Sequence, residues 1–162
     1  MPKRNKFPRS HYHITTMNMG ELVPIYCDEV LPGDIWQHRI SALVRVGAQV
    51  YPTMHPVRVR IHSWFCPLRL IWDDYEDFFT GGNDGDQTPT HPYISAGTTV
   101  AAGSLYNYLG LPNGTYSAAP KFNALFIRAY QKIYAEHYRD QDLITEPTIS
   151  TASGPIVTGK PR

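Results

Sequence analysis

The sequence lacks the features that mark secreted, disulfide-stabilised or membrane-spanning proteins. Only two cysteines, Cys27 and Cys66, occur in 162 residues, which is too few for a disulfide framework or a zinc site. No apolar run approaches the ~18 residues of a membrane span, and no apolar stretch follows the basic N-terminus as in a secretory signal. We therefore expect reduced, buried thiols, a reducing compartment and no membrane partner.

Catalytic and metal-binding motifs are also lacking. There is no Gly-rich phosphate loop, nucleophile elbow or Cys/His spacing of a metal site. His11 and His13 have no third ligand beside them, and residues 83–89 lack the Glu and the flanking helices of a calcium loop. We therefore predict no bound metal and no cofactor.

One dense group of carboxylates remains as a possible catalytic site, at Asp73, Asp74, Glu76 and Asp77. Glycoside hydrolysis needs two acids facing each other across a cleft in separate environments. Four acids on one short helix are more typical of a solvated face that favours the helix N-terminus. We therefore predict that the protein is not an enzyme and has no catalytic residues.

Charge is present but unevenly distributed, although the net charge is only +1. Six carboxylates and no Lys or Arg lie between Leu70 and Asp86. No acidic residue precedes Glu21, and the first ten residues carry four cations, Lys3, Arg4, Lys6 and Arg9. Residues 1–13 therefore form either a basic arm that contacts phosphate and releases counterions or an ordinary disordered terminus.

Two runs of alternating apolar and polar residues, 40–46 and 57–66, predict strands with one buried face. The other face of the second run carries basic and aromatic side chains: Arg58, Arg60, His62 and Trp64. Such a mixture binds single-stranded nucleic acid by charge and stacking. The alternative is a strand face covered by neighbouring loops, with the arginines paired to carboxylates such as those at 73–77.

Helical periodicity appears at three places. Residues 70–79 form an expected short helix that ends at two glycines, and residues 105–109 form another. Residues 121–138 repeat apolar side chains at helical spacing, which predicts an amphipathic helix with Arg128 on its polar side. From Thr145 onward the sequence has no pattern that predicts packing.

These few elements predict an incomplete fold. Loops of ~20 residues are uncommon inside a compact domain, and two strands cannot close a stable sheet by themselves. We therefore expect the remaining strands of the fold to lie outside this chain.

Several linear motifs, in one order, carry a resemblance to a known family: Asn18-Met-Gly-Glu-Leu-Val-Pro-Ile-Tyr26, Glu29-Val-Leu-Pro-Gly-Asp34, Met54-His-Pro-Val-Arg-Val59, Arg69-Leu-Ile-Trp-Asp-Asp-Tyr-Glu-Asp-Phe-Phe-Thr-Gly-Gly82, and Arg128-Ala-Tyr-Gln131 with Tyr138-Arg-Asp-Gln141. Over about residues 10–144 the sequence resembles the major capsid protein of microviruses, in the gokushovirus-like branch of these small single-stranded DNA phages.

The resemblance implies a mainly β fold with helical insertions, the N-terminal part of an eight-stranded viral jelly roll completed by strands outside this chain. Residues 36–46 and 56–66 would be strands facing each other across its two sheets. The expected divisions are a basic N-terminal arm at 1–13, the jelly-roll part with its insertions at 14–144, and a flexible Thr/Ser/Gly/Pro segment at 145–162. A fragment, a cleavage product and one product of a split gene all fit this expectation.

The function implied by the resemblance is structural, in the icosahedral capsid of the virion, with assembly in the bacterial host cytoplasm. Expected partners are other copies of the capsid protein, the remainder of the capsid polypeptide, packaged single-stranded DNA and a minor DNA-binding or scaffold protein. The candidate nucleic-acid-binding residues are Lys3, Arg4, Lys6, Arg9, Arg58, Arg60 and Trp64. The alternative function is a stand-alone module that binds single-stranded nucleic acid.

Overall fold

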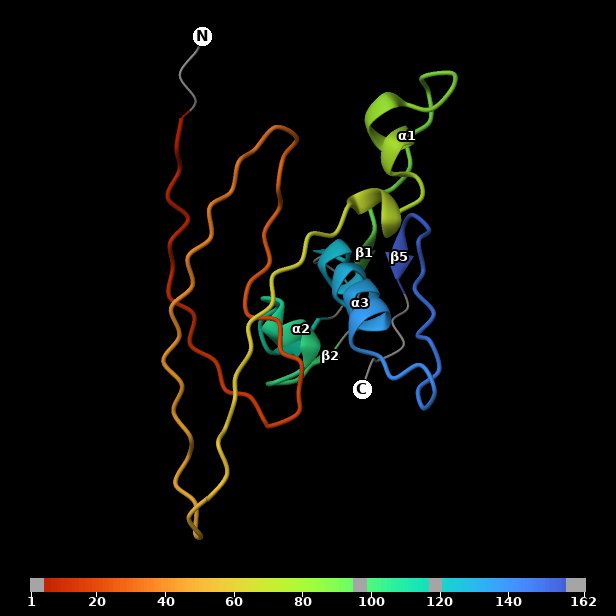
Figure 1. Cartoon of the computed structure of the whole chain (residues 1–162). Coiled ribbons are helices and arrows are strands. Elements are labelled where there is room, and N and C mark those ends of the chain that lie inside the picture. The colour runs from red at the N-terminus through yellow and green to blue at the C-terminus, as the bar shows by residue number, and fades with distance from the viewer. Residues whose placement is uncertain (1–4, 95–98, 117–120, 157–162) are drawn as a thin grey trace. The chain divides into compact units, whose positions relative to one another are not determined.

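The computed structural model describes residues 5–94, 99–116 and 121–156 (Figure 1). The chain divides into two compact units. We call residues 1–27 together with 66–162 the main unit, and Asp28–Phe65 the extended unit. All helices and strands of the described residues belong to the main unit.

The elements of the main unit are short apart from one helix. In chain order they are η1 (Leu68–Leu70), α1 (Tyr75–Thr80), β1 (Tyr93–Ile94), β2 (Thr99–Val100), α2 (Leu105–Tyr108), β3 (Gly114–Thr115), β4 (Phe122–Asn123), α3 (Leu125–His137) and β5 (Pro155–Ile156). One sheet has the order β4-β1-β5, in which β1 is antiparallel to β4 and parallel to β5. A second sheet pairs β2 with β3 in antiparallel fashion. Among these described helices none is long and apolar enough to cross a membrane.

The core of the main unit consists of two apolar clusters that meet at α3. The larger contains Ile127 together with Ile94, Val100, Leu111 and Ala124. The smaller contains Leu125, Ile71 and Trp72. Because α3 contributes to both clusters, it is the element around which the unit packs.

The long helix is confirmed, but both its start and its buried face differ from the prediction. It begins at Leu125 because Phe122–Asn123 pair with β1, and the Leu125 N–H donates to Asn123 Oδ1 at 2.9 Å. Its buried residues are Leu125, Ile127, Arg128, Gln131 and Ala135. Arg128, expected on the polar side, is only 2% exposed, so the buried face is rotated relative to the aromatic stripe of the sequence.

The short helix after residue 70 is also confirmed in part. Its α-helical portion begins at Tyr75, because the chain first makes the turn η1 and then buries Ile71 and Trp72. It ends as predicted: Gly81 has φ 81° and its N–H donates to Asp77 O at 2.8 Å. A Cβ at Gly81 would lie 2.8 Å from Gly85 O, so glycine is needed for both its conformation and its close contact.

The prediction that nothing after Thr145 packs is wrong. Residues 151–156, which we call the C-terminal strap, lie against the main unit and end in β5 (Figure 1). The Asp73 N–H donates to Thr151 O, and the Tyr93 N–H donates to Gly154 O, each at 3.1 Å. A segment of turn-forming residues can therefore pack when distant backbone groups satisfy its hydrogen bonds.

The strands predicted at 36–46 and 56–66 are not present. Residues 28–65, all of which are described, contain no helix or strand, and Figure 1 shows them as an extended out-and-back trace in orange and yellow. Every side chain in this unit is exposed except the half-buried Asp28 and Trp36. The alternating pattern is there, but a strand also needs a neighbouring backbone to pair with, and residues 28–65 do not provide one.

Candidate nucleic-acid interface

The basic arm is exposed along its described length. Residues 5–14, which include Lys6 and Arg9, are exposed and form no helix or strand. Lys3 and Arg4 lie outside the described residues. An extended cationic segment with exposed side chains has the form that phosphate contact requires.

Two tyrosine hydroxyls attach the segment behind the arm to the helices of the main unit. Tyr108 OH donates to Thr16 O at 3.0 Å, and Tyr130 OH donates to Leu22 O at 2.8 Å. Neither tyrosine was singled out for this role in the sequence, because their partners are 92 and 108 residues away. These contacts define where the attached chain ends and the exposed arm begins.

We expect Tyr130→Phe to loosen the segment around Leu22 without unfolding α3. Losing one hydrogen bond to a carbonyl costs about 0.5–1.5 kcal/mol, so amide exchange near Leu22 should become about two- to tenfold faster. Tyr134→Phe on the same helix is the matched control. Unchanged exchange in Tyr130→Phe, or an equal effect in the control, would contradict this role.

The same hydrogen bond predicts a loss of attachment at alkaline pH. Burial raises the pKa of Tyr130, with Tyr134 and Tyr138 adding to the effect. Because the folded-state pKa is raised, the stabilisation is present below the ordinary tyrosine value of about 10 and is lost as the pH rises through the folded-state value. The protection factor of the amides near Leu22, which corrects for the intrinsic pH dependence of exchange, should therefore stay constant at neutral pH and fall as the pH rises through the raised pKa of Tyr130.

The second candidate surface lies in the extended unit. Arg58, Arg60 and Trp64 are exposed, with Trp64 at 46%. The rings of His62 and Trp64 meet edge to face at 6.3 Å between centroids. The arm belongs to the main unit and this surface belongs to the extended unit.

The four carboxylates at 73–77 differ in their hydrogen bonding. Asp73 Oδ2 accepts a hydrogen bond from Thr151 Oγ1, and Asp74 Oδ2 accepts one from Ser153 Oγ, each at 2.5 Å. Ser153 Oγ in turn accepts from the indole Nε1 of Trp72 at 2.8 Å. Two of the four carboxylates therefore hold the C-terminal strap, which the sequence pattern did not indicate.

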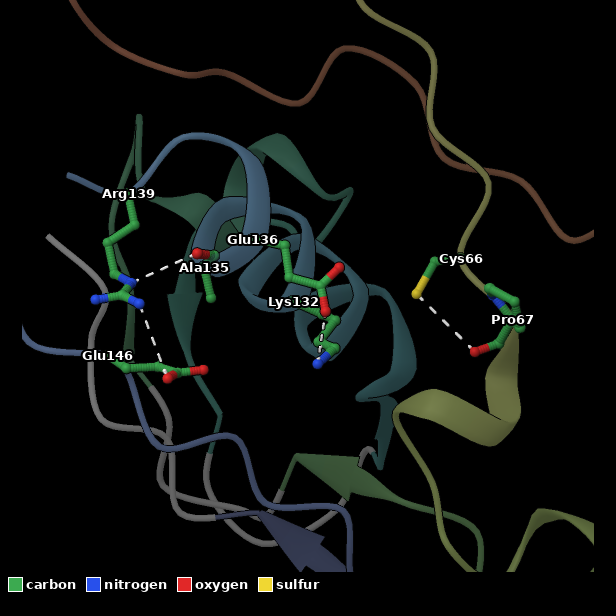
Figure 2. A network of polar contacts seen from close by, with 7 residues as sticks. All are labelled: Cys66, Pro67, Lys132, Ala135, Glu136, Arg139 and Glu146. Carbon is green, nitrogen blue, oxygen red and sulfur yellow. Dashed lines mark hydrogen bonds and ion pairs between the residues drawn. The ribbon is translucent and has the colours of Figure 1, made fainter. Parts of the chain in front are cut away.

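Figure 2 shows further polar contacts along the C-terminal half of α3. Lys132 Nζ lies 2.7 Å from Glu136 Oε1, and Arg139 Nη2 lies 3.9 Å from Glu146 Oε2. Burial raises the pKa of the Cys66 thiol, and the Glu136 carboxylate raises it further. A higher pKa leaves less of the reactive thiolate. In this network the charged side chains are paired, and the Cys66 thiol ionises less readily than a free cysteine.

A cleft adjoins this network, lined by Leu70, Lys132, Thr151 and residues 146–149. Its two charged side chains, Lys132 and Glu146, are engaged with Glu136 and Arg139. Within the described residues there is no group of three or more His, Cys, Asp or Glu that could hold a metal ion.

Taken together, an exposed basic arm and a long exposed apolar segment are typical of a subunit whose surfaces are covered in a larger assembly. The family model described as "Capsid protein (F protein)" of phages matches residues 1–158, and the chain belongs to this family. The small sheets and few helices are consistent with a viral capsid fold. A phage capsid protein is a component of the virion.

Three relatives carry the name capsid protein VP1. The chain is 37% identical over 150 residues to that of Chlamydia phage 1, covering 87% of this chain and 25% of the relative. It is 36% identical over 156 residues to that of Bdellovibrio phage phiMH2K and 30% identical over 160 residues to that of Spiroplasma virus 4, covering 94% of this chain and 29% of the relative in each case. The chain thus spans less than a third of the length of these relatives. The resemblance to microvirus capsid proteins is confirmed.

Proposed function

We propose that this chain forms part of the icosahedral shell of a small single-stranded DNA phage. The proposal rests on one observation in the extended unit: its apolar side chains alternate along the backbone yet remain exposed. Val57, Val59 and Ile61 are 47%, 45% and 39% exposed. Apolar surface contributes about 25 cal/mol for each Å² removed from water, so this segment gains stability when further chain covers it.

The covering chain in this proposal is the remainder of the capsid polypeptide. Strands from it would pair with residues 36–46 and 56–66 and complete an eight-stranded jelly roll. Pairing would satisfy the exposed backbone groups and bury one face of each run. The length of the relatives, of which this chain spans at most 29%, supports such additional strands.

Genome contact is the second part of the proposal. Lys3, Arg4, Lys6 and Arg9 would lie on the inner wall and neutralise phosphates of packaged single-stranded DNA. Arg58, Arg60 and Trp64 form a second candidate contact through charge and stacking. Other copies of the capsid protein and a minor DNA-binding or scaffold protein are the further partners, with assembly in the bacterial host cytoplasm.

Removing the four cations of the arm should lower the DNA content of each particle while leaving the subunit folded. We expect Lys3, Arg4, Lys6 and Arg9 changed to Ala to do this, and the log–log salt slope of DNA binding to fall by about 0.7 for each cation removed. The measurement is nucleic acid per particle, from absorbance and mass.

A matched comparison separates the effect of the arm on DNA content from the effect of net charge. Lys6→Ala/Arg9→Ala and Arg69→Ala/Lys121→Ala each remove two cations, but only the first pair lies in the arm. Equal DNA content in parent and arm-variant shells would refute genome contact by the arm.

Sedimentation separates the shell subunit from the alternative, a stand-alone nucleic-acid-binding module. A shell component co-sediments with a large assembly or is insoluble alone. A module would be a soluble monomer whose DNA binding falls steeply with salt. The second result would overturn the proposed function.

A further inference from the structure

The helix α1 and the turn after it present an exposed aromatic surface. We call Tyr75–Asp86 the α1 cap. Phe78 and Phe79 are 42% and 69% exposed, and their ring centroids lie 5.2 Å apart. Phe78 also packs at 5.1 Å against Trp72, which is 1% exposed. The exposed rings are therefore held in place from behind by a buried side chain.

The same surface carries charge of a single sign. Its carboxylates belong to Glu76, Asp77, Asp84 and Asp86, and no Lys or Arg lies between residues 70 and 86. In the described part of the chain these four carboxylates have no ion pair or side-chain hydrogen bond. A partner that covers the α1 cap must therefore supply both apolar surface and positive charge.

The turn that carries two of these carboxylates is well defined. The Gly85 N–H donates to Gly82 O at 3.2 Å, and the Gln87 N–H donates to Gly81 O at 2.9 Å. Gly81, Gly82 and Gly85 all have positive φ. A partner would thus meet a preformed surface, which lowers the entropy cost of binding.

The N-terminal arm has the complementary chemistry. Phe7 is 80% exposed and stands between Lys6 and Arg9, in a stretch with no acidic residue before Glu21. Within a single copy Phe7, Phe78 and Phe79 are all exposed, so Phe7 does not cover the two phenylalanines of its own α1 cap. Two complementary surfaces that stay uncovered in one copy can cover each other between copies.

We propose that the α1 cap binds the basic N-terminal arm of a second copy of this chain. Phe7 packs on Phe78 and Phe79, and the arm cations pair with Glu76 and the turn carboxylates. The contact rests on the proposed function, because it specifies one of the subunit contacts of the shell. An arm held by a cap is not at the same time on DNA, so each arm makes one contact or the other.

Charge reversal and charge exchange test this contact in the intact chain. Glu76→Lys/Asp84→Lys in the cap, or Lys6→Glu/Arg9→Glu in the arm, should each weaken self-association by about tenfold in sedimentation equilibrium. Combining the two sets should restore most of the affinity. Asp142→Lys/Glu146→Lys is the control, since it changes the net charge equally at exposed positions outside the cap.

A second variant tests the apolar part. Phe79→Ser should also weaken self-association, while leaving its salt dependence close to that of the parent. Circular dichroism shows in each case that the variant is folded.

Three results would overturn the inference. The first is a parent chain that stays monomeric. The second is a cap-reversal variant that self-associates no more weakly than the control variant. The third is a combined variant whose self-association affinity is not restored. Normal shells from cap variants would also overturn this contact but would leave the proposed shell function intact, whereas the absence of any shell from the parent would remove both.

Discussion

Trp72→Ala should lower the free energy of unfolding of the main unit by about 3–5 kcal/mol, the range for removing a large buried aromatic side chain. Trp72 is 1% exposed and lies in the smaller core cluster with Ile71 and Leu125. Its ring also packs against Tyr75 at 6.1 Å and His91 at 5.3 Å. Its removal therefore leaves a cavity where α1, α3 and the chain before β1 meet.

The effect of Trp72→Ala includes the loss of a polar contact. The indole N–H donates to Ser153 Oγ at 2.8 Å, so the variant also releases one attachment of the C-terminal strap. Trp72→Phe keeps an aromatic ring in the core but loses this donor and part of the buried ring system, so its cost should be smaller than that of Trp72→Ala. Urea denaturation measures the free energy of unfolding of the parent and of the two variants.

Trp64→Ala is the matched control, because Trp64 is 46% exposed in the extended unit. We expect a change in unfolding free energy within about 0.5 kcal/mol, as for ordinary surface substitutions. Equal destabilisation by the two alanine variants would contradict the core described here.

Arg128→Leu should destabilise the main unit by about 2–5 kcal/mol, because it removes a buried cation that donates to two carbonyls, one of them on the buried residue Ile71. Arg128 Nη1 donates to Ile71 O at 2.9 Å, and Nη2 donates to Ala152 O at 2.6 Å. Burial lowers the pKa of the guanidinium, and the Asp73 carboxylate acts in the opposite direction. One side chain thus links α3 to the chain after η1 and to the C-terminal strap.

Two further variants isolate the geometry of this contact. Arg128→Lys keeps the charge but lacks the planar fork that reaches two carbonyls, so an intermediate loss is expected. Lys132→Met removes a cation from the same helix whose partner, Glu136, lies at the surface, where an ion pair adds little to stability. Amide exchange across 151–156 should accelerate in Arg128→Leu and stay at the parent rate in Lys132→Met. The reverse order would refute the link.

Local chemistry explains which elements were predictable. The end of α1 at Gly81 follows from glycine's freedom to adopt positive φ, and α3 follows from the periodicity of its apolar residues. The rotation of α3 was not predictable, because Arg128 bonds to carbonyls 57 and 24 residues away. From the sequence alone, an arginine is predicted to lie at the surface, because its buried hydrogen-bond partners are not known.

The predictions for the C-terminal strap and for the extended unit were wrong for opposite reasons. The strap has the composition of a loop, yet Trp72, Asp73 and Asp74 supply the hydrogen bonds that order it. Residues 28–65 have the alternation of strands, yet no backbone within that unit pairs with them. The sequence pattern indicates which secondary structure a segment can adopt, but the segment adopts it only where other parts of the chain supply hydrogen-bond partners.

The candidate binding residues that the structure describes are exposed, as their sequence pattern indicates. Arg58, Arg60 and Trp64 are exposed, as are Lys6 and Arg9, whereas Lys3 and Arg4 lie outside the described residues. Contact of any of them with DNA stays a prediction. The arm and the 58–64 surface belong to different units of the chain, and composition and spacing alone did not indicate this division.

Electron microscopy of the purified material, combined with intact mass spectrometry, shows whether this chain forms part of a phage shell. We expect small uniform shells that contain this chain together with the remainder of the capsid polypeptide. A monodisperse monomer that forms no assembly would contradict it and would favour the single-stranded nucleic-acid-binding module.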